Sequence, residues 1–157
     1  NIKVVREFEK GVEITALAGE VRQAFSNLIT NALDAMPDGG TLVLRVSKSP
    51  EWSNSNVNGV RITILDTGSG IDPKHKKNVF QPFFTTKQDV GTGLGLWITR
   101  GIVEKHRGSI RMKSRTGQEV HGTAFSIFLP TEYAAGKRTE DALETEPNSA
   151  ISARGPA

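Results

Sequence analysis

The chain has 157 residues, of which 36% are apolar and 24% charged, and its net charge is +3. This composition is typical of one soluble globular domain, and no apolar run reaches the roughly 18–20 residues of a membrane span. The absence of cysteine excludes disulfides and thiolate metal sites. A cysteine-free chain fits a reducing compartment, so we expect a cytoplasmic location. Basic residues form no dense stripe, and we expect no nucleic-acid partner.

The apolar periodicity and the turn residues predict nine elements. In chain order they are strands at 3–8 and 12–17, a helix at 20–36, strands at 41–47 and 59–65, helices at 73–79 and 94–106, and strands at 109–114 and 123–129. Strands come in pairs, which favours an α+β two-layer sandwich over a doubly wound fold. We expect a mixed, mostly antiparallel sheet covered on one face by about three helices. Residues 1–130 would form this domain, and residues 131–157, poor in large apolar residues, a tail or linker.

A polar stripe runs along the first predicted helix. Gln23, Asn27 and Asn31 are four residues apart and therefore share one face. An amide oxygen is a hard neutral ligand that suits Mg²⁺, which usually also keeps water and phosphate oxygens. The alternative is that these amides are buried and bonded to the backbone.

A carboxylate follows the strand at 59–65, in the segment Asp66-Thr67-Gly68-Ser69-Gly70-Ile71. Its glycines allow close approach of the backbone to a ligand. A carboxylate would repel phosphate, but it can accept a hydrogen bond from an exocyclic amine such as that of adenine. A tight turn capped by the aspartate is the alternative.

A glycine-rich segment, Gly91-Thr92-Gly93-Leu94-Gly95-Leu96, opens the helix at 94–106. Glycines before a helix expose backbone N–H groups at its positive end, which favours phosphate. The pattern matches neither the Rossmann fingerprint nor a P-loop. The preceding residues 80–87 supply aromatic side chains and a lysine, and residues 85–93 have the composition of a mobile lid.

These segments, in this order, resemble the sequence boxes of bacterial sensor histidine kinases. Residues 27–32 resemble the N box, 66–70 the G1 box, 80–87 the F box and 91–96 the G2 box, while Gly122-Thr123 resembles the start of the last strand of the family. The resemblance covers about residues 1–130. It implies the Bergerat fold of the catalytic ATP-binding domain, which gyrase-type ATPases share. The F box and the short lid resemble those of nitrogen-regulator-type kinases.

The resemblance implies that ATP or ADP is bound with Mg²⁺. Asn31 would ligate the metal with Asn27 in support, and Asp66 would bond the adenine amine with Thr123 nearby. The full set of implied nucleotide-binding residues is Asn27, Asn31, Asp34, Ala35, Asp66, Gly68, Gly70, Ile71, Thr86, Lys87, Gly91, Thr92, Gly93, Leu94, Gly95, Leu96 and Thr123.

The same resemblance implies which residues contact the other parts of the nucleotide. Ala35 and Ile71 would flank the base, and Asp34 would lie near the ribose or the phosphates. Lys87 and the backbone of residues 91–96 would hold the phosphates.

One position separates the kinase branch from the ATPase branch of this fold. The ATPases carry a glutamate four residues before the metal-binding asparagine, where it acts as general base for water. Here that position is Asn27, which has no useful basicity. We therefore expect slow hydrolysis, with the γ-phosphate kept for an outside nucleophile, and we assign no catalytic side chain with certainty.

The expected nucleophile is a histidine, and none of the three in this chain fits the phospho-acceptor pattern. His75, His106 and His121 lack an adjacent acidic residue followed by the expected helix, and His106 is expected to cap a helix. We expect a catalytic domain that does not phosphorylate itself and is monomeric. Its partners would be its own dimerisation hairpin and a response regulator, and the parent protein could be membrane-anchored. An anti-sigma-factor-type serine kinase and a non-catalytic nucleotide-binding switch are the alternatives.

Overall fold

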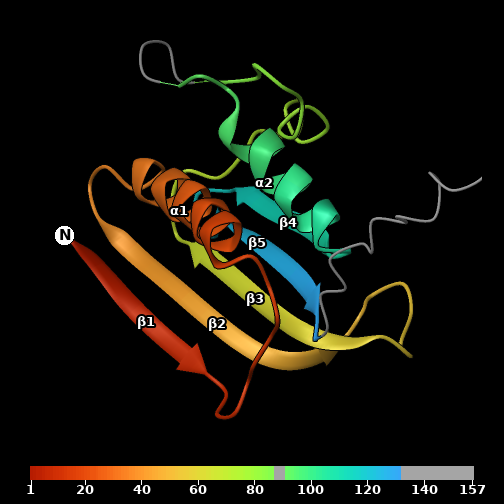
Figure 1. Ribbon diagram of the computed structural model, residues 1–157. Coiled ribbons are helices and arrows are strands. Elements are labelled where there is room, and N and C mark those ends of the chain that lie inside the picture. Colours follow the sequence, from red (N-terminus) through yellow and green to blue (C-terminus); the bar gives the residue numbers. More distant parts are fainter. Residues whose placement is uncertain (87–90, 132–157) are drawn as a thin grey trace, which may run out of the picture.

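The computed structural model describes residues 1–86 and 91–131 (Figure 1). Its elements are β1 (Ile2–Phe8), α1 (Ala18–Asp34), β2 (Gly40–Pro50), β3 (Asn58–Asp66), α2 (Gly95–Lys105), β4 (Ser109–Thr116) and β5 (His121–Pro130). Each lies within a few residues of a predicted element. No helix in the described ranges has the length and apolar character needed to cross a bilayer.

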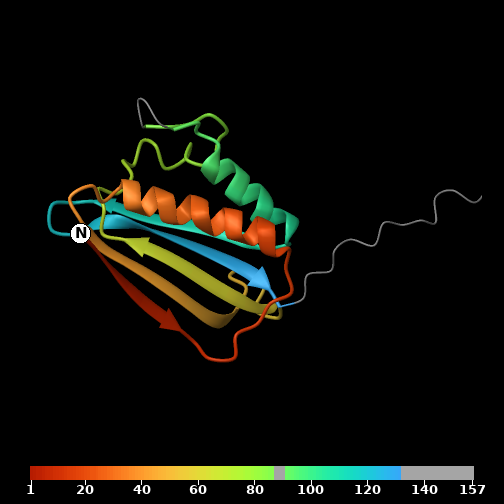
Figure 2. The ribbon, with the colours of Figure 1, turned by 60° about the vertical axis from the view of Figure 1, so that its left-hand side comes forward.

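The five strands form one sheet in the order β1-β2-β3-β5-β4. β1 runs parallel to β2, whereas the other neighbouring strands are antiparallel. Both helices lie on the same face of the sheet, as Figure 2 shows. The predicted α+β fold with a mixed, mostly antiparallel sheet is therefore confirmed.

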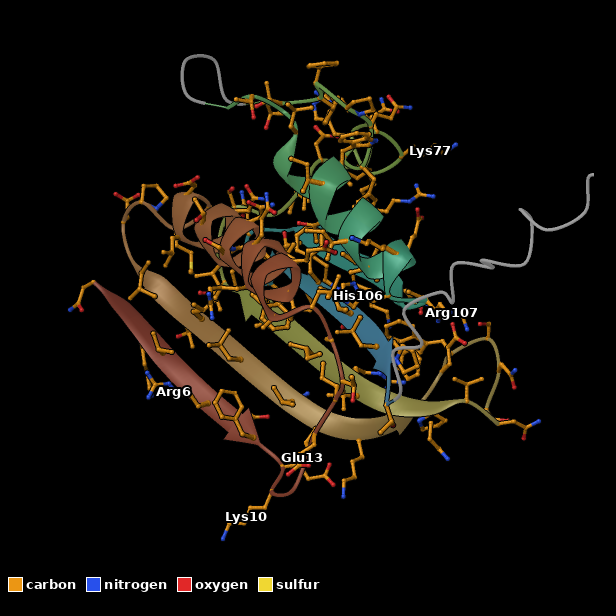
Figure 3. All side chains as sticks on the ribbon, viewed as in Figure 1. Arg6, Lys10, Glu13, Lys77, His106 and Arg107 are labelled. Carbon is orange, nitrogen blue, oxygen red and sulfur yellow. The ribbon has the colours of Figure 1, made fainter. Side chains whose placement is uncertain are left out.

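The predicted number of helices is wrong, because two helices rather than three are present in the described residues. The segment predicted as a helix at 73–79 is a series of turns. Its hydrogen bonds span three residues, as from His75 N to Asp72 O at 2.9 Å and from Asn78 N to His75 O at 2.9 Å. Lys77 is exposed and points away from the domain (Figure 3). The segment offers too few apolar side chains to hold a helix against the sheet.

The predicted strand at 12–17 is also wrong. This segment connects β1 to α1 and pairs with no strand of the described sheet (Figure 2). Val12 and Ile14 pack against the core, which accounts for the alternating pattern in the sequence. The connection instead ends at a buried histidine, since Leu17 N donates to His106 Nε2 at 3.1 Å. His106 is the C-cap residue of α2, in agreement with the expected capping role.

The core lies between the two helices and the sheet. Its fully buried members are Leu28, Ala32, Met36, Leu42, Val60, Ile62, Ile64, Val103, Phe125, Ile127 and Leu129. Leu28 and Ala32 fix the rotation of α1 on the sheet, because both must face the strands. Asn27 and Asn31 each precede one of these positions, so they lie at the side of α1 rather than on its outer surface.

Candidate functional site

A cavity of about 570 Å³ lies between α1, the end of β3, residues 69–86 and the start of α2. Fourteen of the seventeen predicted site residues line it: Asn27, Asn31, Asp34, Ala35, Asp66, Gly70, Ile71, Thr86, Gly91, Thr92, Gly93, Gly95, Leu96 and Thr123. Gly68 and Leu94 are not among the lining residues, and Lys87 lies outside the described residues. The three separate sequence segments therefore meet at one cavity.

Asp66 is the buried carboxylate of the cavity. It ends β3, is 4% exposed, and its Oδ1 accepts backbone hydrogen bonds from Gly68 at 2.9 Å and Thr123 at 3.1 Å. Burial raises the pKa of Asp66, and the backbone donors oppose that rise. The bond from Gly68 is the predicted turn cap, so one side chain both caps the turn and lines the cavity.

The glycine after Asp66 packs against α1. A Cβ on Gly68 would lie 2.5 Å from the carbonyl oxygen of Ala35, and the next residue, Ser69, donates its N–H to the same oxygen at 3.0 Å. Gly68 is thus needed for close packing between this loop and the end of α1. Its role is to place Asp66 and Ser69, both of which line the cavity.

Asn27 connects the two helices. Its Nδ2 donates to Gly95 O at 3.1 Å and to Thr99 Oγ1 at 3.3 Å. Thr99 Oγ1 itself donates to Gly95 O at 2.8 Å. The amide of Asn27 therefore holds the first turn of α2 in place. One of its two partners is a backbone carbonyl, as in the alternative given for these amides, although Asn27 is only partly buried.

Asn31 and Asp34 lie further along α1, at the wall of the same cavity. They offer an amide oxygen and a carboxylate, both hard oxygen donors. The described residues contain no group of three or more His, Asp or Glu that could hold a metal by themselves. The donor set fits Mg²⁺, which proteins commonly hold through one or two side chains together with phosphate oxygens.

The start of α2 forms the opposite end of the cavity. Gly95 and Leu96 line it, the N-cap residue Leu94 makes no side-chain capping bond, and Leu94 N donates to Thr92 Oγ1 at 3.4 Å. Gly93 has φ of +67°, and a Cβ there would lie 2.4 Å from the carbonyl carbon of Phe83. A helix N-terminus after a glycine turn favours an anion.

Several residues of the cavity wall were not predicted individually: Thr30, Ser69, His75, Val79, Phe84, Thr85 and Phe125. Phe84 and Thr85 belong to the recognised F-box segment, so a signal for them was present. No sequence signal marks His75 as part of this wall, and its ring lies 5.4 Å from that of Phe84. Ser114, which is 8% exposed and lies 3.0 Å from Thr123 Oγ1, gave no local signal.

The fold and the cavity define an α+β domain of the nucleotide-binding class, with a buried carboxylate at one end of the site and a helix N-terminus at the other. The chain belongs to the family of histidine kinase-, DNA gyrase B- and HSP90-like ATPases, whose family model matches residues 17–133. The predicted family is thereby confirmed. The narrower likeness to nitrogen-regulator-type kinases stays a prediction.

Curated relatives of this chain are bacterial kinases. The chain is 38% identical to sporulation kinase A of Bacillus subtilis (strain 168) over 124 residues, which are 78% of this chain and 19% of that protein. It is also 38% identical to sensor kinase CckA of Brucella abortus (strain 2308) over 138 residues, which are 82% of this chain and 14% of that protein. The chain therefore spans less than a fifth of the length of these two relatives.

Solved structures give the same result. The catalytic domain of histidine kinase ThkA matches with a TM-score of 0.69 and 28% identity, covering 83% of this chain and 81% of that one. Full-length ShkA in complex with AMPPNP matches with a TM-score of 0.69 and 26% identity, covering 87% of this chain and 27% of that one. The first is a histidine kinase by name, and the second is in complex with AMPPNP, an ATP analogue.

Proposed function

We propose that this chain is the ATP-binding catalytic domain of a two-component sensor histidine kinase and binds ATP or ADP with Mg²⁺. The observation that carries the proposal is the pairing of a buried, backbone-anchored Asp66 with the N-terminus of α2 across one cavity. The first group suits an exocyclic amine and the second suits phosphate. The kinase relatives and the ATP-analogue complex of ShkA support the same assignment.

The base would lie at the Asp66 end of the cavity. The carboxylate of Asp66 would accept a hydrogen bond from the adenine amine. The hydroxyl of Thr123 lies beside this carboxylate, because Thr123 pairs with Asp66 across β3 and β5. Ala35 and Ile71, both in the cavity wall, supply apolar surface for the faces of the base. Gly68 would contribute indirectly, because its backbone N–H holds the carboxylate of Asp66 in place.

The phosphates would lie at the start of α2. The backbone of Gly91–Leu96 and the helix N-terminus would hold them together with Thr86 and, as the resemblance implies, Lys87, which lies outside the described residues. Asn31 would hold Mg²⁺, and Asp34 would contact the ribose or a phosphate. When bound, the metal neutralises phosphate charge.

Asn27 favours a kinase over an ATPase. Its amide has no useful basicity, and Nδ2 is already directed at Gly95 O and Thr99 Oγ1. It therefore does not act as a general base for water. The γ-phosphate would be kept for a histidine on a dimerisation hairpin, which is not among the elements of the described residues, and a response regulator would receive the phosphoryl group next. Because the substrate is ATP, we place the domain in the cytoplasm.

Calorimetry with ADP, with and without Mg²⁺, tests the assignment. Asn31→Ala should weaken Mg²⁺-dependent binding by about tenfold and affect Mg²⁺-free binding much less. Gln23→Ala, an exposed position on the same stripe of α1, is the matched control and should change neither. Equal losses with and without the metal would remove Asn31 from the metal site.

Phosphate transfer tests the class of enzyme. The purified chain should release phosphate from ATP very slowly and should phosphorylate a dimerisation hairpin of its parent added in trans. Rapid steady-state release of phosphate by the chain alone would contradict the kinase assignment. The named relatives do not favour the serine-kinase and switch alternatives.

A further inference from the structure

We propose that Ser114 fixes the hydroxyl proton of Thr123 and thereby makes the base-binding end of the cavity selective for an exocyclic amine over a carbonyl oxygen. The inference rests on the proposed nucleotide site and concerns a residue outside it. Ser114 does not line the cavity, so it would act as a positioning residue through Thr123.

Ser114 lies on β4, directly opposite Thr123 on β5. Its Oγ contacts three groups: Ile71 N at 2.7 Å, Gly122 O at 3.0 Å and Thr123 Oγ1 at 3.0 Å. Lys76 Nζ donates to the backbone carbonyl of Ser114 at 2.5 Å. Ser114 as a whole is 8% exposed, so these contacts are shielded from water.

The donors and acceptors of these contacts leave one consistent arrangement. A serine hydroxyl has one proton and two lone pairs. Ile71 N–H can only donate, and the Gly122 carbonyl can only accept. The proton of Ser114 therefore goes to Gly122 O, and the proton of Thr123 goes to Ser114 Oγ. The reverse assignment would leave Ser114 Oγ and Gly122 O 3.0 Å apart with no proton between them.

The arrangement determines what Thr123 presents to the cavity. With its proton committed to Ser114, Thr123 Oγ1 has only acceptor lone pairs left for a ligand. Its neighbour Asp66, which accepts the Thr123 N–H at 3.1 Å, is also an acceptor when ionised. Two acceptors side by side match an amine at C6 of a purine, whereas a C6 carbonyl oxygen would face groups of the same polarity.

Binding of ADP and of inosine diphosphate, which carries a carbonyl in place of the C6 amine, tests the inference. In Ser114→Ala the freed Thr123 hydroxyl can rotate and donate to that carbonyl, so the ratio of ADP to inosine diphosphate affinity should fall about five- to tenfold. Ser126→Ala is the matched control. Its hydroxyl also pairs with a threonine, Thr63 Oγ1 at 3.0 Å, but neither residue lines the cavity, so the ratio should not change.

The possible outcomes separate the inference from the proposed function. A wild-type chain that binds neither nucleotide contradicts the proposed function itself. A Ser114→Ala variant that binds both nucleotides with an unchanged ratio overturns the inference, since a purely structural role weakens both equally. Should Ser114→Ala fail to fold, Thr123→Val keeps the shape and the backbone N–H of residue 123 but removes the hydroxyl. It should lower the same ratio, and an unchanged ratio overturns the inference as well.

Discussion

The side-chain amide of Asn27 donates to the carbonyl oxygen of Gly95 at 3.1 Å and so joins the middle of α1 to the first residue of α2. A second contact, to Thr99 Oγ1 at 3.3 Å, fixes the next turn of α2. Asn31 follows one turn after Asn27 on the same helix. The proposed metal ligand and the proposed phosphate-binding helix end are therefore held in one geometry by a single amide.

Replacing this amide should loosen that geometry. Asn27→Ala removes both hydrogen bonds, and we expect a loss of about 1–2 kcal/mol in the free energy of unfolding, together with weaker ADP binding. Urea titration and calorimetry measure the two effects. Gln23→Ala, four residues earlier on α1 and exposed, should leave both unchanged. Unaltered stability in Asn27→Ala would show that α2 is held by its packing alone.

Asp66→Asn should weaken ADP binding without lowering the stability of the fold. The amide oxygen can still accept from Gly68 and Thr123, which leaves its NH₂ group where the adenine amine would bind. Because the substitution removes a buried charge, we expect the free energy of unfolding at neutral pH to stay level or rise by about 0.5–1 kcal/mol. ADP affinity should fall at least about tenfold.

The control for this substitution is Asp38→Asn, which changes an exposed carboxylate in the turn after α1. It should alter neither quantity. Undiminished ADP affinity in Asp66→Asn, measured by calorimetry, would exclude Asp66 as the group that recognises the base.

The pH dependence follows from the raised pKa of Asp66, which burial causes. Above its ordinary pKa of about 4, the folded chain retains a proton that the unfolded chain has lost. The contribution of Asp66 to stability therefore decreases as the pH rises from that value through the folded pKa. ADP affinity should change in the opposite direction, because the ionised carboxylate is the better acceptor.

Comparing the wild type with Asp66→Asn isolates these two trends. The difference in unfolding free energy between them should grow in favour of Asn as the pH is raised through this window. ADP binding by the wild type should strengthen over the same range. Parallel curves for the two proteins would mean that Asp66 does not titrate in this window.

The parts of the site that the sequence predicts are those whose chemistry is local. Asp66 and its glycines are neighbours in the chain, and the glycines before α2 adjoin the helix end that they expose. The apolar spacing of α1 was equally informative, because Leu28 and Ala32 must face the sheet. These features depend on residues within one or two turns of each other.

The parts that were missed depend on contacts distant in sequence. Ser114 reaches Ile71 across 43 residues, and only the pairing of β4 with β5 brings it to Thr123. The false strand at 12–17 arose because Val12 and Ile14 are partly buried against the core without a partner strand, which produces the same alternation. The segment predicted as a helix at 73–79 forms turns instead, because Val79 is its one buried residue and a single apolar contact is too little to hold a helix against the sheet.

The glycine turn before α2 offers a test of the phosphate-binding end. Gly93 adopts φ of +67°, and an added Cβ would lie 2.4 Å from the carbonyl carbon of Phe83. Gly93→Ala should therefore reduce the free energy of unfolding by about 1 kcal/mol or more and weaken ADP binding by shifting the loop.

For a second glycine, which lies within α2, substitution by alanine is expected to raise the free energy of unfolding. Gly101 is helical and exposed, with nothing within 4 Å of an added Cβ. Gly101→Ala should raise the free energy of unfolding by about 0.5–1 kcal/mol, because alanine is the better helix former, and should leave ADP binding unchanged. Thermal unfolding and calorimetry measure both variants. If Gly93→Ala kept full ADP affinity despite its lower stability, the 91–96 backbone would not hold the phosphates, and the anion site would have to lie elsewhere in the cavity.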